Sequence, residues 1–288
     1  MSTDGLDPRQ PVFDFHVRLA PRPGAAEALL RLLDDAGITR AIVCAGGTMD
    51  RITLSRQLTD GGHVETDADN NAVLAAAARS GGRLVPFHFA NPHRGPEVYR
   101  AAAAAVSGLE LSPVVHGVGL GDPRVTALVT VAGEFRHPVY VAPLSRPGSG
   151  VADVVALAAT FPAVTFVLGH TGVGNIDYHG LDLVAGSPNI MVETSGGYTD
   201  VLRFAVDRLG PSRLLFGTEA PLQHPRVELT KYAVLGLPAD AWRRIAWDNA
   251  VRLLAPGSAG SAPDPAASTH ESEGGGNDLD HQPAAADR

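Results

Sequence analysis

The sequence predicts a single (β/α)8 TIM barrel with a short extension before it and a disordered tail after it. Between residues 12 and 254, eight short apolar, β-rich runs alternate with Ala- and Leu-rich helical runs. A barrel of this kind usually takes about 250 residues, which this segment nearly matches. A doubly wound open sheet is the competing architecture, but no glycine-rich phosphate loop follows the first strand.

The eight strands are expected where short apolar runs are bounded by turn-forming residues. These runs are 12–19, 39–45, 83–89, 114–120, 138–144, 164–170, 189–194 and 213–218. Helical periodicity predicts the intervening helices at 25–36, 70–80, 96–107, 124–135, 150–161, 199–209 and 226–235. A last helix is expected after Leu237, because Pro238 suits a helix start. The connection 175–187 is expected to be irregular, and 46–69 to be a lid over the barrel mouth or a mobile loop.

The chain changes character at its carboxyl end. Residues 255–288 are rich in Gly, Pro, Ala and acidic residues, so we expect them to be disordered. Six acids and one base give this tail −5 of the net charge of −8. The body, an extension at 1–11 and a barrel at 12–254, is therefore nearly neutral. No basic face for nucleic acid is expected.

Two rare residue types exclude several kinds of chemistry. Cys44 is the only cysteine, so the chain holds no internal disulfide, CxxC pair or cysteine-built zinc site. Lys231 is the only lysine and lies in an expected surface helix, which argues against a Schiff-base mechanism. No apolar run has membrane-spanning length and the first ten residues lack a signal-peptide core, so a cytoplasmic location is expected.

Chemically active side chains gather at the carboxyl ends of the expected strands, where TIM barrels place their active sites. In the first strand, VFDFHVRL, side chains alternate between faces, so Asp14, His16 and Arg18 should share one face and Phe15 and Val17 the other. Asp14 has a second interpretation, as an anchor for backbone amides. Polar residues also end or follow other strands, namely His88, Asn91, Arg146, His170, Glu193, Ser195 and Glu219.

A histidine alone at a strand end is more often a structural hydrogen-bonding group than a catalytic one. Convergence of several ends favours a joint catalytic role for His16, His170 and Glu219, with Arg18 as an anion clamp. We expect the substrate to contact His88, Asn91, Arg146, Glu193 and Ser195. His137 precedes the fifth strand and should face the opposite end of the barrel.

The body resembles the amidohydrolase-related proteins, in the amidohydrolase 2 branch of the metal-dependent TIM-barrel hydrolases that includes decarboxylases of the aminocarboxymuconate-semialdehyde type. The resemblance rests on the order and spacing of FDFHVRL, LVPFHFANPH, HGVGLGDP, HPVYVAP, FPAVTFVLGHTG, NIMVETSG, RLLFGTEAPL and IAWDNAVRLL. It implies a TIM-barrel enzyme, a small-molecule substrate and commonly a homodimer.

In that family two first-strand histidines, a fifth-strand histidine and an eighth-strand aspartate hold a divalent metal, commonly zinc. Here His16 is kept, Arg18 replaces the second histidine, Ala142 stands at the fifth strand, and Glu219 replaces the aspartate. The bridging-lysine position of the fourth strand is read as Gly119. Because a catalytic zinc site needs about three protein ligands, no metal is favoured. If one binds, its ligands would be His16, His170 and Glu219.

Three functions follow from this set of residues. The first is a hydrolase or decarboxylase that acts on a small carboxylate- or carbonyl-containing substrate by His/Glu acid–base chemistry, with Arg18 holding an anion. The second is a metal-dependent hydrolase with a non-standard site. The third is a catalytically inactive descendant that binds a ligand.

Overall fold

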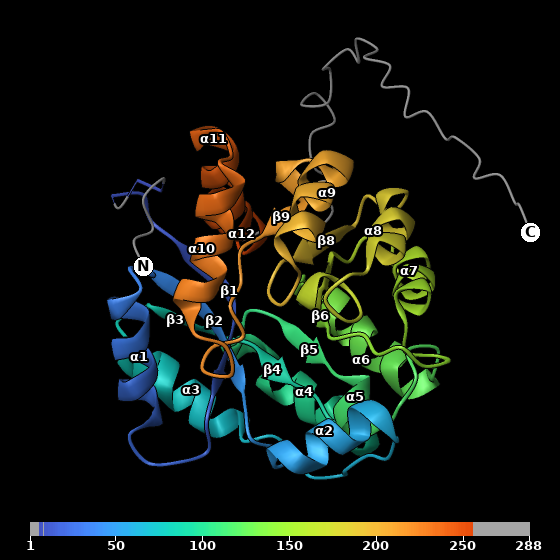
Figure 1. Cartoon of the computed structure of the whole chain (residues 1–288). Helices are drawn as coiled ribbons and strands as arrows, with labels where there is room; N and C mark the ends of the chain where they lie inside the picture. Colours follow the sequence, from blue (N-terminus) through green and yellow to red (C-terminus); the bar gives the residue numbers. More distant parts are fainter. Residues whose placement is uncertain (1–5, 8, 256–288) are drawn as a thin grey trace, which may run out of the picture.

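The computed structural model describes residues 6–7 and 9–255 as a parallel barrel with helices around it (Figure 1). The expected disordered tail lies, from residue 256 onward, outside the described residues. The strands are β1 (Phe13–Leu19), β2 (Arg40–Ala45), β3 (Leu84–Pro86), β4 (His88–Phe89), β5 (Leu109–Leu111), β6 (Val139–Val141), β7 (Phe166–Leu168), β8 (Ile190–Glu193) and β9 (Leu214–Leu215). The helices are α1 (Ala25–Asp35), α2 (Arg51–Thr59), α3 (Asn70–Arg79), α4 (Pro96–Ala102), α5 (Pro113–His116), α6 (Pro123–Glu134), α7 (Val151–Thr160), α8 (Tyr178–Ala185), α9 (Thr199–Leu209), α10 (Pro225–Leu235), α11 (Ala239–Arg243) and α12 (Asn249–Leu253).

Hydrogen bonds between the first and last strands close the barrel. The parallel ladders run β1-β2-β3 and β4-β5-β6-β7-β8-β9. The first strand meets the last through Phe15, whose N–H donates to Phe216 O at 2.7 Å. Between β3 and β4, Pro86 has no N–H, and the N–H of Phe87 continues the ladder by donating to Val43 O at 3.0 Å. β3 and β4 therefore act as one strand, and the predicted eight-stranded barrel is confirmed.

The first strand does not alternate as expected. Its pairing with β2 shifts register between Asp14 and Val17. Phe13 and Phe15 pack in the cluster that includes Tyr140 and other strand residues, whereas Val17 packs in the larger cluster shared with the helices. Phe15 and Val17 thus lie on different sides of the sheet. The irregularity is a β-bulge, which redirects the side chains that follow it.

Two predictions were wrong, for the fourth strand and for the connection 175–187, and two further segments differ from expectation only in detail. The fourth strand is β5 at Leu109–Leu111, because Pro113 begins the short helix α5 where a strand at 114–120 was expected. The connection 175–187 contains α8, whose first turn is capped by Asp177. The last helix is interrupted by a π-helical turn at Arg244–Asp248. The connection 46–69 contains α2, begun by Asp50, whose side chain accepts hydrogen bonds from the second and third residues of that helix.

Arg213 fixes the segment between α8 and β8. Its guanidinium, nearly buried, donates to the carbonyl groups of Val184, Ala185, Ser187 and Ile190 at 2.7 to 3.1 Å. Burial lowers its pKa to about 10. Because one side chain satisfies several carbonyls at the end of α8, it holds in place the strand that carries Glu193.

Replacing Arg213 with Met should therefore lower the free energy of unfolding by about 3 kcal/mol, because the charge-assisted hydrogen bonds are lost while the carbonyls stay buried. Urea denaturation measures the change. The control is Arg208→Met, which removes an exposed ion pair with Asp182. Equal losses in the two variants would contradict the role given to Arg213.

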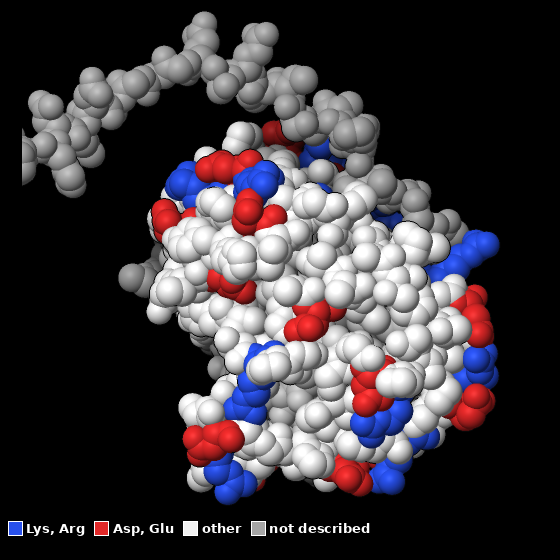
Figure 2. Space-filling view, turned by 90° about the vertical axis from the view of Figure 1, so that its right-hand side faces the viewer, with Lys and Arg blue, Asp and Glu red and all other residues white. Residues whose placement is uncertain are grey.

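The surface in Figure 2 carries acidic and basic side chains side by side, with no large patch of one sign on that face. Within the described residues, no helix combines the length and the apolar character needed to span a membrane.

Candidate active site at the carboxyl end of the barrel

The four residues expected to do the chemistry come together in the structure. Glu219 is the centre, because each of its carboxylate oxygens faces a different partner. Oε1 accepts a hydrogen bond from Arg18 Nε at 3.1 Å. Oε2 contacts His16 Nδ1 and lies 3.7 Å from His170 Nε2. β1, the loop after β7 and the loop after β9 thus meet at one carboxylate.

The backbone at this site is strained. Among the described non-glycine residues, four have positive φ, and His170 and Glu219 are two of them, with φ of 58° and 57°. Thr171, next to His170, has φ of 60°. A left-handed conformation is unfavourable for residues with a Cβ atom and persists where the surroundings enforce it, commonly at functional sites. The strain therefore marks the place where the predicted site residues converge.

Glu110 is a site residue that sequence reasoning missed. It lies on β5, fully buried, and its Oε1 is 2.7 Å from Arg18 Nη2. Arg18 thus joins Glu110 to Glu219, while its Nη1 donates to Ala45 O at 3.3 Å and its guanidinium lies 5.4 Å from the ring centre of Phe89. In the sequence, Glu110 is an acid between two leucines, LEL. Because the fourth strand was expected at 114–120, this stretch was assigned to a loop. Gly119 consequently lies outside the barrel strands.

His16 stands between the two carboxylates. Its Nδ1 contacts Glu219, and its Nε2 lies 3.6 Å from Oε1 of Glu110. Its ring stacks on that of Tyr140, with centres 4.2 Å apart and an angle of 9°. The thiol of Cys44 lies beside the same nitrogen and Glu110. Neither Tyr140 nor Cys44 was expected at the site, and both belong to it because they face His16.

For Glu110, Glu219 and His16, the combined effect of neighbouring charges on the pKa is larger than the opposing effect of burial. Burial alone would raise the pKa of Glu110, but Arg18 and His16 lower it to about 2. Burial also opposes ionisation of Glu219, yet His16, Arg18 and His170 hold its pKa well below the usual value. Burial disfavours charged His16, but Glu219 raises the pKa of His16 well above its usual value. Two cations, Arg18 and protonated His16, therefore balance two carboxylates.

His170 is the most exposed member of the site. Its side chain is 29% exposed, against 17% for Arg18 and Glu219 and none for His16. It follows β7 in the short turn Gly169–Thr171. Because it alone combines exposure with a ring nitrogen facing Glu219, it is the group best placed to meet a substrate.

Glu193 and Ser195 are buried behind His170. The Nδ1 of His170 lies 2.9 Å from Ser195 Oγ, and its backbone N–H donates to Glu193 Oε2 at 3.0 Å. Glu193 has no exposed surface and Ser195 only 1%. Both were expected to contact the substrate, whereas the structure places them against His170.

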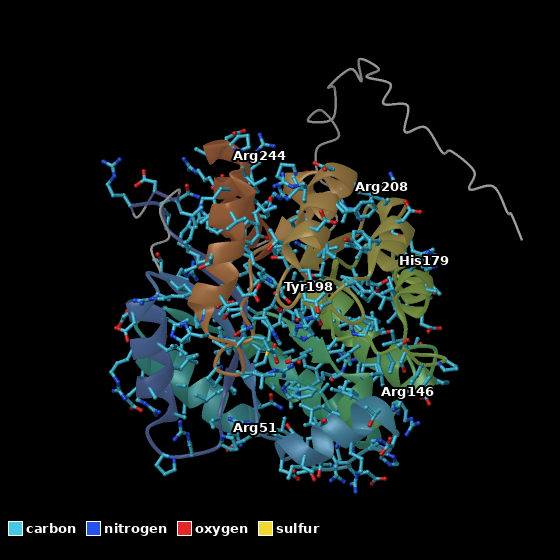
Figure 3. All side chains as sticks on the ribbon, viewed as in Figure 1. Arg51, Arg146, His179, Tyr198, Arg208 and Arg244 are labelled. Carbon is cyan, nitrogen blue, oxygen red and sulfur yellow. The ribbon has the colours of Figure 1, made fainter. Side chains whose placement is uncertain are left out.

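The other expected substrate contacts lie away from this cluster. His88 is buried with its ring 5.2 Å from that of Tyr99 on α4, and burial lowers its pKa to about 4. Asn91 is buried and donates to Glu65 O and Asp67 Oδ1, anchoring the loop before α3. Arg146 donates to Gln57 O on α2 and lies at the edge of the molecule (Figure 3).

Asp14 has the structural role that was one of its two interpretations. Its carboxyl group accepts hydrogen bonds from the backbone N–H of His16 at 3.1 Å and of Thr218 at 3.0 Å, and from the Thr218 hydroxyl. Burial raises its pKa to about 8. These bonds tie β1 to the segment that carries Glu219.

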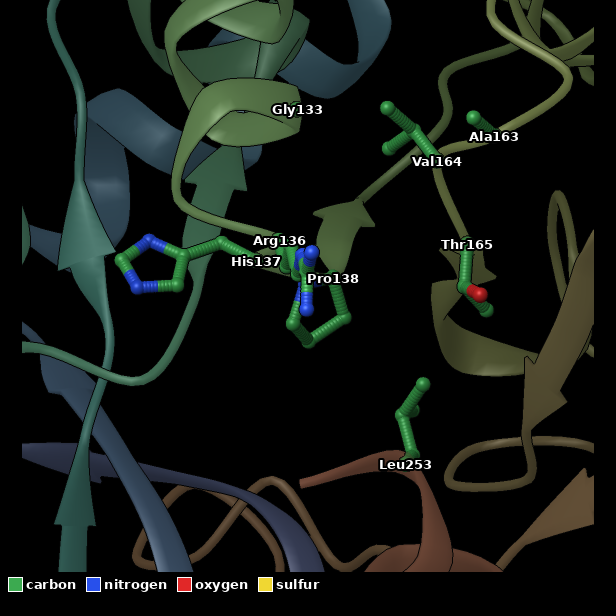
Figure 4. Close-up of a pocket in the computed structure, with 8 residues that line it drawn as sticks. All are labelled: Gly133, Arg136, His137, Pro138, Ala163, Val164, Thr165 and Leu253. Carbon is green, nitrogen blue, oxygen red and sulfur yellow. The ribbon is translucent and has the colours of Figure 1, made fainter. Parts of the chain in front are cut away.

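His137 lies apart from the site, at the opposite end of its strand, as predicted. Its Nδ1 is 2.6 Å from the hydroxyl of Tyr99. It lines a small hollow with Arg136, Pro138 and Leu253 (Figure 4). Because these residues precede β6 or end the last helix, α12, the hollow is separate from the His170 cluster.

The residues present fit a three-ligand metal site and not the four-ligand site expected from the resemblance. Ligand atoms of His16, His170 and Glu219 lie within 4.8 Å of one another. Both ring nitrogens of His16 and Oε2 of Glu219 are buried and form no hydrogen bond of good geometry among the described residues. However, Arg18 places a permanent cation on the same carboxylate, and Ala142 offers no ligand atom.

Comparison with known proteins places the site in context. Residues 13–255 match the family described as amidohydrolase. Among solved structures, 5-carboxyvanillate decarboxylase from Sphingomonas paucimobilis is 16% identical with a TM-score of 0.61, covering 85% of this chain and 99% of that one. For 2,6-dihydroxybenzoate decarboxylase from Rhizobium the identity is 15%, the TM-score 0.63, and the coverage 85% and 98%. No match was found among curated proteins.

A third solved structure bears on the metal. The 5-carboxyvanillate decarboxylase from Novosphingobium aromaticivorans, complexed with manganese, is 13% identical with a TM-score of 0.64, covering 88% of this chain and 99% of that one. At such identities these likenesses establish the barrel fold. The family match agrees with the expectation of an amidohydrolase-related enzyme. None of the comparisons supports the expectation that no metal is favoured.

Proposed function

This chain belongs to the amidohydrolase family, and from this premise we propose that it is a hydrolase or decarboxylase for a small carboxylate- or carbonyl-containing substrate. The observation that carries the proposal is the cluster of His16, Arg18, His170 and Glu219 at the carboxyl end of the barrel. Retained backbone strain at His170 and Glu219 supports a working site over an inactive descendant.

His170 is the proton-transfer group in this proposal. It is the most exposed of the four, and the carboxylate of Glu219 stabilises the imidazolium that forms when Nε2 takes up a proton. In a decarboxylation, the bond to the leaving carboxylate breaks, its electrons remain on the substrate carbon, and His170 delivers the proton to that carbon. In a hydrolysis, the same nitrogen removes a proton from the attacking water.

Arg18 is the anion-binding group. A guanidinium has five N–H groups. Hydrogen bonds to Glu219 and Ala45 use two of those in Arg18, and Nη2 forms an ion pair with Glu110. We assign the remaining N–H groups to a substrate. Its fixed fork suits a carboxylate. The Arg18 side chain is 17% exposed and faces the same carboxylate, Glu219, as His170, so we place a bound carboxylate between the cation and the proton donor.

Turnover of a panel of small aromatic and aliphatic carboxylates and lactones tests the activity. Release of CO2 identifies decarboxylation, and consumption of base at constant pH identifies hydrolysis. If ligands raise the melting temperature and none is turned over, the chain is a binding protein and the catalytic proposal is wrong.

We further propose that the site works without a resident metal, because Arg18 and protonated His16 already balance the two carboxylates. A divalent metal is the second candidate, favoured by the convergence of His16, His170 and Glu219. Bound there, it would act as a Lewis acid toward a substrate oxygen. Its entry would require His16 to lose its proton.

Metal analysis separates the two candidates. After dialysis against a metal-free buffer, the protein should hold far less than one equivalent of zinc or manganese and should keep its activity in the presence of a chelator. One equivalent of retained metal, together with activity lost to a chelator and restored by Zn²⁺ or Mn²⁺, would establish the metal-dependent alternative.

The homodimer and the cytoplasmic location expected from the sequence stay predictions. Light scattering of the purified protein tests the homodimer.

A further inference from the structure

We infer that Ser195 and Glu193 are positioning residues that fix the tautomer of His170. The neutral imidazole would carry its proton on Nδ1 and present an unprotonated Nε2 toward Glu219. This inference rests on the proposed function only in treating His170 as the proton-transfer group. The hydrogen-bond directions that support it are independent of any substrate.

Both carboxylate oxygens of Glu193 accept hydrogen bonds from neighbouring groups. Oε1 accepts from the backbone N–H of Ser195 at 2.7 Å. Oε2 accepts from the backbone N–H of His170 at 3.0 Å, from the hydroxyl of Tyr140 at 2.8 Å and from that of Ser195 at 3.0 Å. An ionised carboxylate has no hydrogen to donate, so all four partners donate to it.

Ser195 therefore has no hydrogen left for His170. A hydroxyl group carries one hydrogen, and that of Ser195 points to Glu193. Because His170 Nδ1 lies 2.9 Å from Ser195 Oγ, this contact is a hydrogen bond only if Nδ1 donates. The direction of the bond thus places the imidazole proton on Nδ1.

No hydrogen-bond donor among the groups bound to Glu193 is directed at Nε2, the other ring nitrogen of His170. Nε2 is 3.5 Å from the Tyr140 hydroxyl, whose hydrogen is also directed to Glu193. Its remaining neighbour is Oε2 of Glu219, at 3.7 Å, which is an acceptor. Nε2 is therefore the unprotonated nitrogen of the neutral ring, and it faces the carboxylate of Glu219.

Two glycines make room for this network. A Cβ atom on Gly217 would lie 2.0 Å from Oε1 of Glu193, and one on Gly169 would lie 2.3 Å from the Tyr140 hydroxyl. Neither distance is compatible with a side chain. The sequences LGH and FGT therefore carry glycine because the Tyr140–Glu193 pair occupies the space where a side chain would begin.

Nitrogen-15 NMR of the full chain labelled at its histidines tests the inference directly. His170→Asn identifies the His170 signals among those of the eleven histidines. At a pH where His170 is neutral, the protonated nitrogen should be Nδ1 in the wild type. Ser195→Ala should shift the populations toward the Nε2–H form. An Nε2–H tautomer in the wild type would overturn the inference, whatever the variants do.

Kinetics give a second readout that a merely structural role would not produce. Ser195→Ala should lower kcat by about 10- to 100-fold, the usual loss when the group orienting a functional histidine is removed. KM should change little, because Ser195 does not reach the substrate, and Ser195→Thr, which keeps the hydroxyl, should recover part of kcat. A change confined to KM would contradict the positioning role.

The two proposals fail in different ways. If the wild-type tautomer is Nδ1–H but no substrate is turned over, the positioning role stands and the catalytic proposal falls. If the protein is active and its neutral His170 is the Nε2–H form, the proposed activity stands, while the positioning role and the assignment of Nε2 as the proton acceptor both fall.

Discussion

Replacing His170 with Asn should lower kcat by about 10²- to 10⁴-fold, the range expected when a general acid–base group is removed. Asn is chosen because residue 170 has φ of 58°, a conformation that Asn tolerates better than most residues. The strained turn should then persist, and only the imidazole is lost. Steady-state kinetics on a substrate from the carboxylate panel measures the effect, and circular dichroism verifies the fold.

The matched control is His179→Asn. His179 lies on the outer face, in α8, away from the barrel mouth (Figure 3). Its replacement should leave kcat within a factor of two to three, since it touches none of the four site residues. Unchanged turnover in His170→Asn would remove His170 from the mechanism and leave His16, which is completely buried, as the remaining histidine of the cluster.

Removing the buried carboxylate of Glu110 should have the largest effect on stability. In the Glu110→Ala variant, Arg18 has one carboxylate partner instead of two. The position that the Glu110 carboxylate occupied is buried and has no contact with solvent. Loss of one member of a buried ion pair costs about 3 kcal/mol or more. Urea denaturation measures the loss, and Glu97→Ala, which removes an exposed acid near Arg100, is the control that should change stability little.

The pH dependence of stability gives a second test of Glu110. The pKa of Glu110 in the folded protein is lowered to about 2, below the value of an unfolded chain. A lowered pKa means that the unfolded state binds more protons in acid, so this contribution is present above about pH 4.5 and is lost as the pH falls toward 2. Glu110→Gln should therefore flatten the stability profile in that window. An unchanged slope would show that Glu110 is not held ionised by Arg18.

The fold and the central residues of the site were predictable for the same physical reason. Parallel strands end at one rim, so polar residues at strand ends identify the rim and, with it, His16, His170 and Glu219. Strand lengths were less predictable, because apolar runs such as 164–170 continue into turns. The run at 114–120 was misread because apolar residues that pack a short helix have the same composition as those in a strand.

Glu110 shows what the sequence could not reveal. An acid between two leucines has no special status until the fold brings the side chain of Glu110 on β5 within reach of Arg18 on β1, which supplies the opposite charge. The sequence also did not indicate that the side chain of His88 faces Tyr99 instead of the barrel mouth. The positioning role of Ser195 depends on which atom donates each hydrogen, which residue spacing does not encode.

The contact between Arg18 and Glu110 also constrains how this chain can evolve. A single substitution of Arg18 by His would place a second histidine in the first strand, but it would leave Glu110 buried beside a weaker and titratable cation. Replacing Glu110 alone leaves Arg18 with Glu219 as a carboxylate partner, so either single change weakens the same charge balance without removing it. The two positions are therefore coupled, and a double-mutant cycle on Arg18 and Glu110 should give a total change in unfolding free energy that differs from the sum of the two single changes.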